Sequence, residues 1–224
     1  LNIVHSDLRS RQNLLLQTGV QNLKLTDIYN SFINNGFAQR CELNLMPEGL
    51  KSLDGWETLW SAIENLWNRS YTSDRQQNRS LLKKISIAFG IDGGIWPPED
   101  LFIADQFSQD LFSKISEVVW YQSKTNNQSF FNELIPLFTL ADGLELLKQA
   151  EEILSDYWKE KIFSPKEILE WFEKRRSEMN YSSVQQIRSL SIWPTAEGEL
   201  KPLAGLYLAG DFEDPLRLAQ LVDL

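Results

Sequence analysis

Carboxylates are the residues of this chain whose type and spacing come closest to catalytic chemistry. They occur as three adjacent pairs: Glu99 and Asp100, Glu151 and Glu152, and Glu213 and Asp214. A glycosidase or a metal-dependent hydrolase needs two acids held opposite a scissile bond or around an ion. Adjacent acids on a helix do not face each other. A carboxylate-dependent hydrolase or nuclease-like enzyme therefore stands as the alternative to a non-catalytic module.

The chain has few of the residues that nucleophilic catalysis requires. The chain has one histidine, His5, and one cysteine, Cys41. A Ser-His-Asp site would have to use His5, and Cys41 has no other histidine to activate it. No Gly-rich phosphate loop and no Asp-x-Asp-x-Asp-Gly calcium loop occurs. We therefore expect no catalytic residue, no cofactor and no metal, and we interpret Cys41 as a small buried hydrophobic residue.

Composition indicates a folded protein. The chain has 224 residues, of which 42% are apolar and 24% charged, with 8 Trp and 12 Phe. The formal net charge of −9 disfavours nucleic acid and anionic membrane surfaces as partners. A nucleic-acid binder would need the few clustered cations on one face, namely Lys174, Arg175, Arg176 and Arg188.

The sequence also predicts where the protein works. No apolar run reaches the roughly 18 residues that suggest a membrane helix. One cysteine excludes an internal disulfide and a thiolate zinc cage. We expect a cytoplasmic location and no membrane association. The chain starts at Leu1 and stops inside an apolar run, which favours a fragment of a longer protein.

The chain repeats itself. Residues 82–107 align without a gap onto residues 187–212, and every matched pair is 105 positions apart. Self-similarity at a long fixed period indicates an array of structural units. The identical pairs are Ser86/Ser191, Ile87/Ile192, Gly93/Gly198, Pro97/Pro202, Leu101/Leu206, Ala104/Ala209 and Phe107/Phe212. Each copy is typical of a strand, an x-Gly hairpin turn, a short return strand and an exit marked by proline.

Helical patterns surround these hairpins. Hydrophobic spacing and capping residues predict helices over 7–19, 26–35, 54–67, 108–121, 142–161, 165–179 and 184–190. Residues 70–80 are polar and are predicted to be a loop or linker. The apolar stripe of the 54–67 helix is typical of a core, and a groove for a peptide or a small molecule is the alternative. Asp54-Gly55 matches Asp142-Gly143 at an offset of 88. Because this offset is shorter than the 105 of the hairpins, the second unit has extra residues between its helix and its hairpin, and a helix after Ser164-Pro165 fills them.

The sequence thus predicts an α+β fold that is mostly helical, built from two helix-plus-β-hairpin units related by the internal repeat. The first unit is expected over 1–107 and the second over 108–224.

The second copy also resembles a known family. Residues 190–224 are similar to repeated segments of very large sacsin-like proteins, which carry an ATP-binding domain similar to that of Hsp90 chaperones elsewhere in the chain. The matching positions are Thr195, Gly198, Leu200, Pro202, Leu203, Leu206 and Tyr207. The first copy departs from the pattern, with Gly90 in place of Thr195 and Pro98 in place of Leu203. No nucleotide-binding motif of that ATPase is present, so the resemblance implies no ATP site here.

Aromatic residues that the repeat does not need are the candidates for partner contact. Trp96, beside Pro97-Pro98, aligns with Lys201, so the shared hairpin does not require it. Exposed apolar sites of this kind mark interaction surfaces, and ordinary packing is the alternative. The candidates are Trp96, Trp120, Tyr121 and Trp158. We therefore expect a non-catalytic structural or protein-interaction module of a large intracellular chaperone-like ATPase, whose partners are proteins or neighbouring domains of the same chain.

Overall fold

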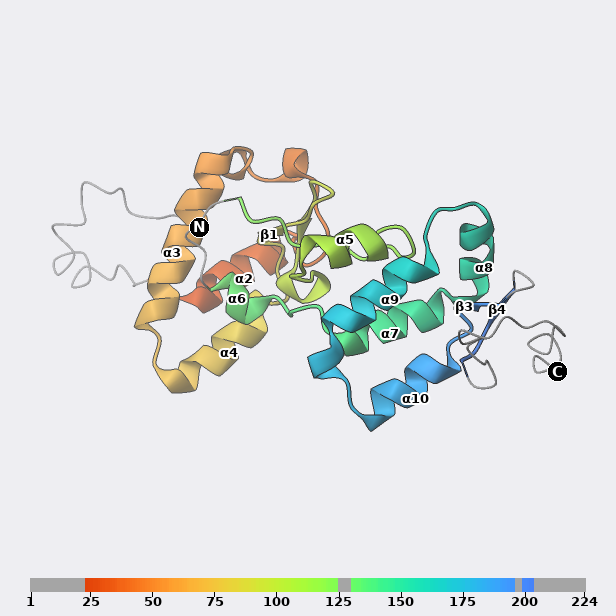
Figure 1. Cartoon of the computed structure of the whole chain (residues 1–224). Helices are drawn as coiled ribbons and strands as arrows, with labels where there is room; N and C mark the ends of the chain where they lie inside the picture. The colour runs from red at the N-terminus through yellow and green to blue at the C-terminus, as the bar shows by residue number, and fades with distance from the viewer. Residues whose placement is uncertain (1–22, 125–129, 196–198, 204–224) are drawn as a thin grey trace, which may run out of the picture. The chain divides into compact units, whose positions relative to one another are not determined.

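The computed structural model describes residues 23–124, 130–195 and 199–203 (Figure 1). The fold is mostly helical, with 57% helix, 9% strand and small antiparallel two-stranded sheets. This confirms the predicted α+β class. Two compact units form, one from Leu1–Ile103 with Val119–Pro136 and one from Ala104–Val118 with Leu137–Leu224. The sequence placed a single division at 107/108, whereas in the structure the chain returns to the first unit after residue 118.

The first unit surrounds its hairpin with helices. Its helical elements are α2 (Leu25–Asn34), η2 (Leu43–Leu45), η3 (Glu48–Leu50), α3 (Leu53–Arg69), α4 (Thr72–Leu82), η4 (Pro98–Asp100) and α6 (Phe131–Leu134). The α2 helix matches the prediction over 26–35. Residues 1–22, with the helix predicted over 7–19, lie outside the described residues.

The aromatic stripe of α3 forms much of this unit's core, as predicted. Ser52 caps the helix by accepting a hydrogen bond from the Gly55 amide at 3.4 Å. The buried face consists of Trp56, Trp60, Ile63 and Trp67. The Trp60 indole donates to the Ile87 carbonyl oxygen at 2.8 Å, so one side chain of α3 fastens the helix to the hairpin.

The prediction of a loop over 70–80 is wrong, because α4 occupies this segment. The segment contains two Gln and two Arg residues, which favour helix. Its apolar content is low, so it lacks the stripe by which an amphipathic helix is recognised. The helix packs along α2 and ends on Leu82, which is fully buried. Tertiary contact therefore stabilises a helix that the hydrophobic pattern did not reveal.

The first hairpin pairs β1 (Ala88–Phe89) with β2 (Ile95–Trp96), with Ala88 opposite Trp96 and Phe89 opposite Ile95. The predicted turn at Asp92-Gly93 is present, and Gly93 has a φ of +80°. The φ of Asp92, the residue before it, is not positive. Only the glycine of this turn therefore uses the left-handed region.

The helix predicted over 108–121 is shorter in the structure. Helix α5 spans Gln106–Phe112, and the chain then becomes extended. Gly90 forms a bridge with Tyr121, and Phe102 forms one with Trp120. The backbone of residues 119–121 is thus paired with segments distant in sequence, which local helical spacing does not anticipate.

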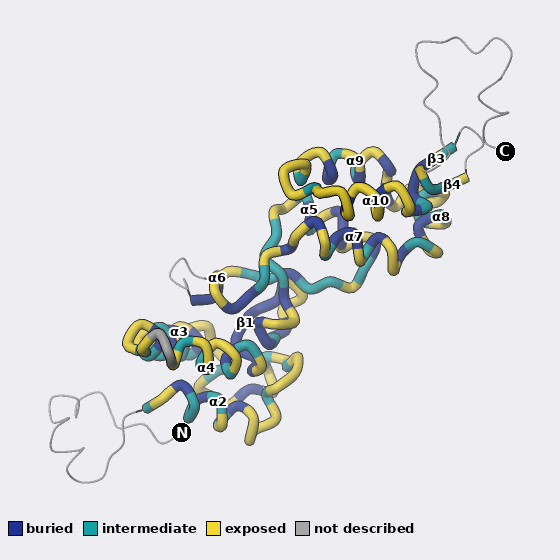
Figure 2. Tube along the Cα trace, turned by 90° about the horizontal axis from the view of Figure 1, so that it is seen from below, coloured by how far each residue is buried: buried dark blue, intermediate teal, exposed yellow. Residues whose placement is uncertain are grey.

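The second unit is built mainly from helices, whose buried faces are dark in Figure 2. Its further elements are α7 (Leu140–Gln149), α8 (Glu151–Lys159), α9 (Pro165–Lys174), η5 (Arg176–Glu178), α10 (Tyr181–Ser189), β3 (Trp193–Pro194) and β4 (Leu200–Lys201). The single helix predicted over 142–161 is two helices that meet at Ala150. Ser164 caps α9 as predicted, whereas α10 begins at Tyr181, after the N-cap Asn180, and not at residue 184.

The second hairpin has the register that the sequence alignment requires. Trp193 lies opposite Lys201 and Pro194 opposite Leu200, and each of these residues is 105 positions beyond its counterpart in the first hairpin. The Thr195 amide donates to the Glu199 carbonyl oxygen at 2.8 Å, as the Gly90 amide donates to Gly94 at 2.9 Å. The turn Glu197-Gly198 lies outside the described residues. The hairpins thus correspond, and the repeat of whole units stays a prediction.

Candidate functional site

Two antiparallel helices of the second unit, α5 and α9, form the frame of the candidate site. At one end, the Arg175 guanidinium beside α9 lies 3.2 Å from the carboxylate of Asp105, the N-cap of α5. At the other end, Lys114 beyond α5 pairs with Glu167 in the first turn of α9 at 2.8 Å. An ion pair at each end fixes the position of α9 along α5.

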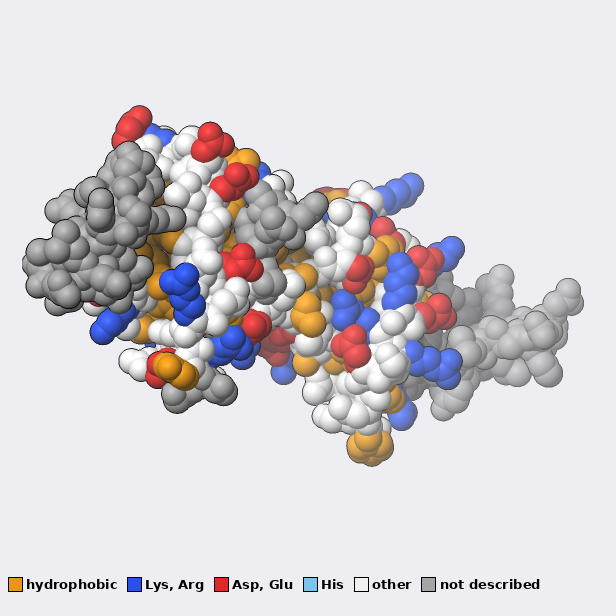
Figure 3. Space-filling model, turned by 90° about the vertical axis from the view of Figure 1, so that its left-hand side faces the viewer, with side chains coloured by type: hydrophobic (Ala, Val, Ile, Leu, Met, Phe, Trp, Pro, Cys, Tyr) orange, Lys and Arg blue, Asp and Glu red, His pale blue; other side chains and the backbone are white. Residues whose placement is uncertain are grey.

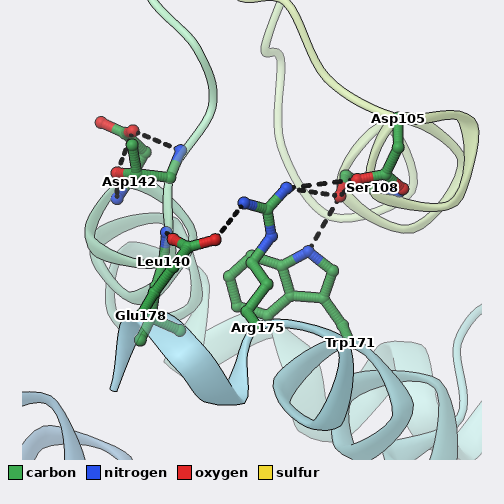
Figure 4. Close-up of polar contacts among 8 residues, drawn as sticks. Asp105, Ser108, Leu140, Asp142, Trp171, Arg175 and Glu178 are labelled. Atoms are coloured by element: carbon green, nitrogen blue, oxygen red, sulfur yellow. Dashed lines mark hydrogen bonds and ion pairs between the residues drawn. The ribbon is translucent and has the colours of Figure 1, made fainter. Parts of the chain in front are cut away.

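Figure 4 shows the Arg175 cluster, in which the guanidinium lies between Asp105 and Ser108 on one side and Glu178 on the other. The Arg175 side chain is 14% exposed. One nitrogen donates to Glu178 at 2.9 Å, and the other Glu178 oxygen accepts from the Leu140 amide at 2.8 Å. Arg175 therefore connects α5, α9 and the first turn of α7 through charge-assisted hydrogen bonds.

The carboxylates of this frame are held in their charged form. Burial by itself would raise the pKa of Asp105. Hydrogen bonds from Ser108 and the positive charge of Arg175 outweigh that burial and lower it. Burial likewise opposes the other causes at Glu167, where hydrogen bonds from Lys114 and the Ser164 amide lower the pKa. Both acids therefore serve as fixed negative charges rather than as proton donors at neutral pH.

Trp171 fills the space between the three helices. Its indole donates to the Ser108 hydroxyl at 2.9 Å, and its ring lies edge-on to Phe112 with centroids 4.9 Å apart. A Cβ at Gly143 would overlap the Trp171 ring, so glycine is required there for α7 and α9 to approach each other. Trp171 therefore joins α5, α7 and α9 in the packed interior of the second unit.

A groove of about 510 Å³ opens where α8 turns into α9. One wall is apolar, formed by the half-buried Trp158 with Ile162 and Phe163. The rest of the lining is polar and consists of Lys114, Lys161, Ser164, Lys166, Glu167 and Glu170. A concave site with an aromatic wall and a few charged groups has the anatomy of a binding site.

The groove contains Trp158, one of the four predicted contact residues, and the structure places the other three in the first unit. Trp96 is half-buried, and its indole donates to the Asp92 carboxylate at 3.0 Å. The Arg40 guanidinium lies 5.7 Å from the Trp96 ring centroid and donates to Asp92 at 2.9 Å. Trp96 is therefore engaged in closing the hairpin turn.

The structure corrects the contact role predicted for Trp120, which is fully buried and so belongs to the packing of the first unit. Tyr121 is half-buried and lies 5.3 Å from the Phe131 ring. Burial, opposed by a hydrogen bond with Ser123, raises the pKa of Tyr121 to about 12. Both residues contact their own unit because residues 119–121 are extended and paired rather than helical.

The acidic pairs serve different local roles. Glu99 and Asp100 lie in η4, where partial burial of the Asp100 carboxyl raises its pKa. Glu151 accepts a hydrogen bond from the Ser191 amide and so connects α8 to the segment before β3, while Glu152 is exposed. Glu213 and Asp214 lie outside the described residues, as does His5. In residues 23–124, 130–195 and 199–203, no group of three or more His, Cys, Asp or Glu could hold a metal ion.

The cations that a nucleic-acid binder would need on one face are not all directed to the surface. Arg175 is turned inward by Asp105 and Glu178, and the Lys174 ammonium lies 3.6 Å from the Phe107 ring centroid. On the face shown in Figure 3, Lys and Arg side chains are interspersed with Asp and Glu. Within the described part of the chain, no helix has the length and apolar character needed to span a membrane.

Comparisons with protein families, with curated proteins and with solved structures found no match for this chain.

Proposed function

We propose that this chain is a non-catalytic structural and protein-interaction module, and that the α8–α9 groove is its contact surface. The groove carries this proposal, because it presents a partly accessible tryptophan beside charged side chains in a rigid setting. Tryptophan in a pocket ringed by polar groups is the typical centre of a binding hot spot.

The way in which the walls are held supports the same proposal. The ends of α9 are fixed by the Lys114–Glu167 and Arg175–Asp105 ion pairs. A binding site on rigid elements loses little conformational entropy when a partner docks. The role of a part of a large cytoplasmic chaperone-like ATPase is supported only by the sequence resemblance of residues 190–224. No specific observation favours the carboxylate-dependent hydrolase, and we do not propose it.

The test is capture of proteins from an extract of the source cells on immobilised wild-type chain, followed by binding assays with each purified candidate. We expect a partner that Trp158→Ala binds at least about tenfold more weakly, because a tryptophan hot spot contributes about 2 kcal/mol or more. Tyr181→Ala is the matched control, since Tyr181 is 81% exposed on α10 and does not line the groove.

The thermal midpoint of each variant should stay close to that of the wild type, which separates lost binding from lost folding. If no purified protein binds the wild-type chain, or if Trp158→Ala binds every partner as tightly as the wild type does, the groove is not the contact surface and the proposal is wrong.

A further inference from the structure

Lys161 closes helix α8 in a conformation that lysine rarely adopts. Its φ is +60°, and it is the one non-glycine residue with positive φ among the described residues. The Lys161 amide donates to the Trp158 carbonyl oxygen at 3.0 Å, and the Ile162 amide donates to the Tyr157 carbonyl oxygen at 2.8 Å. These two bonds define a Schellman motif, in which glycine usually occupies this position. The lysine therefore makes a turn that glycine would make at lower cost.

The residue with this strained backbone also lines the groove. Backbone strain of this kind is concentrated at functional sites. The strain alone does not identify a ligand. The charges of the groove supply that identification.

Of the three lysines in the groove, two are engaged by acids of α9. The Lys114 ammonium lies 2.8 Å from Glu167, and the Lys166 ammonium lies 3.8 Å from Glu170. Lys161 is exposed and forms no ion pair with any residue that the structure describes. Its ammonium is thus the uncompensated charge of the groove, and it lies three residues from Trp158.

The charge balance sets the kind of ligand. Three lysines and two glutamates leave the lining with a net charge of +1. One excess cation suits a ligand with one or two carboxylates, whereas a polyphosphate or a nucleic acid would also meet Glu167, Glu170 and the overall charge of −9. The apolar wall of Trp158 and Ile162 suits an aliphatic or aromatic side chain.

We propose that the groove binds a peptide segment of a protein partner in which an apolar side chain is followed by carboxylates. The apolar side chain packs on Trp158, and a carboxylate pairs with the Lys161 ammonium. This inference rests on the proposed function and specifies the chemistry of the partner.

The test uses the full chain and two fluorescein-labelled decapeptides measured by fluorescence anisotropy. One peptide has a central Leu-Phe-Asp-Glu sequence, and its matched peptide has Leu-Phe-Asn-Gln. We expect the acidic peptide to bind about tenfold more tightly than the amide peptide, and this preference to fall as salt is raised. Lys161→Gln should abolish the preference.

Lys161→Gly separates binding from folding. Glycine relieves the left-handed backbone, so this variant should raise the thermal midpoint by about 2–4 °C while it loses the preference for the acidic peptide. Lys148→Gln is the matched control, because Lys148 is exposed on α7 outside the groove. It should leave both the thermal midpoint and the binding unchanged.

The inference is overturned if the wild-type chain shows no saturable binding of the acidic peptide up to about 1 mM, if it binds both peptides equally, or if Lys161→Gln and Lys161→Gly keep the preference. Loss of partner binding in Trp158→Ala together with unchanged binding in Lys161→Gln would retain the groove as a contact surface and reject only the carboxylate chemistry.

Discussion

Arg175 joins segments of the second unit that are far apart in the sequence, through the ion pairs of one side chain. Replacing it with methionine, which keeps the length of the side chain, removes the donors that hold Asp105 and Glu178. Both acids are partly exposed and regain some hydration, which limits the cost. We expect Arg175→Met to lower the free energy of unfolding by about 2 kcal/mol, measured by urea unfolding.

The neighbouring Arg176 provides the control for this loss. It is exposed at the start of η5, so Arg176→Met should change the free energy of unfolding by no more than about 0.5 kcal/mol. Equal stability of the two variants would show that the Arg175 cluster contributes little to the fold and that the position of α9 is set by packing alone.

Some single residues have roles that the local sequence pattern does not reveal. The sequence shows Arg175 within a cationic run, but its partner Asp105 is 70 positions away. Nothing in the local pattern distinguishes an inward arginine from an exposed one. Lys161 carried no signal, because a positive φ is expected at glycine or asparagine and not at lysine. The residue type of Trp158 is enough to predict a contact residue. The groove beside it is not visible in the sequence, because it forms only where α8 and α9 pack together.

At the scale of elements, the hairpin turn at Gly93 gives a clear prediction. Gly93 has space for a Cβ, but its φ of +80° is a backbone conformation in which a β-branched residue is strained. We expect Gly93→Val to lower the free energy of unfolding by about 1–2 kcal/mol, measured by urea unfolding. Gly49→Ala is the control, because Gly49 has neither a positive φ nor a close neighbour. A similar loss in both variants would argue against a role for the turn conformation.

The elements that the sequence predicted best are those whose signals are local. Helix α9 follows Ser164-Pro165, a capping pair, and α3 carries a broad apolar stripe. The misjudged elements depend on distant contacts. Helix α4 is polar and is stabilised against α2, and the segment after α5 is held extended by pairing with Gly90 and Phe102. Tertiary structure overrides local propensity in both cases.

At the scale of the whole molecule, the net charge of −9 and the groove's charge of +1 act over different distances. At physiological ionic strength, charges more than about 8 Å apart are largely screened. A partner that carries a short acidic segment is therefore repelled weakly by the chain as a whole and attracted locally by Lys161. A long polyanion would contact the acidic surface as well, which is why the groove favours short carboxylate segments.

The two units should also respond separately to destabilisation, because each has its own buried core. The core cluster around α3 consists of first-unit residues, whereas Trp171 and the Arg175 cluster belong to the second unit. Native-state hydrogen exchange resolves such local differences in stability. We expect Arg175→Met to speed amide exchange in α7 and α9 while exchange in α3 stays unchanged. Gly93→Val should speed amide exchange in α3 and leave exchange in α7 and α9 unchanged. Equal acceleration of exchange in both units by either substitution would show that the units unfold as one.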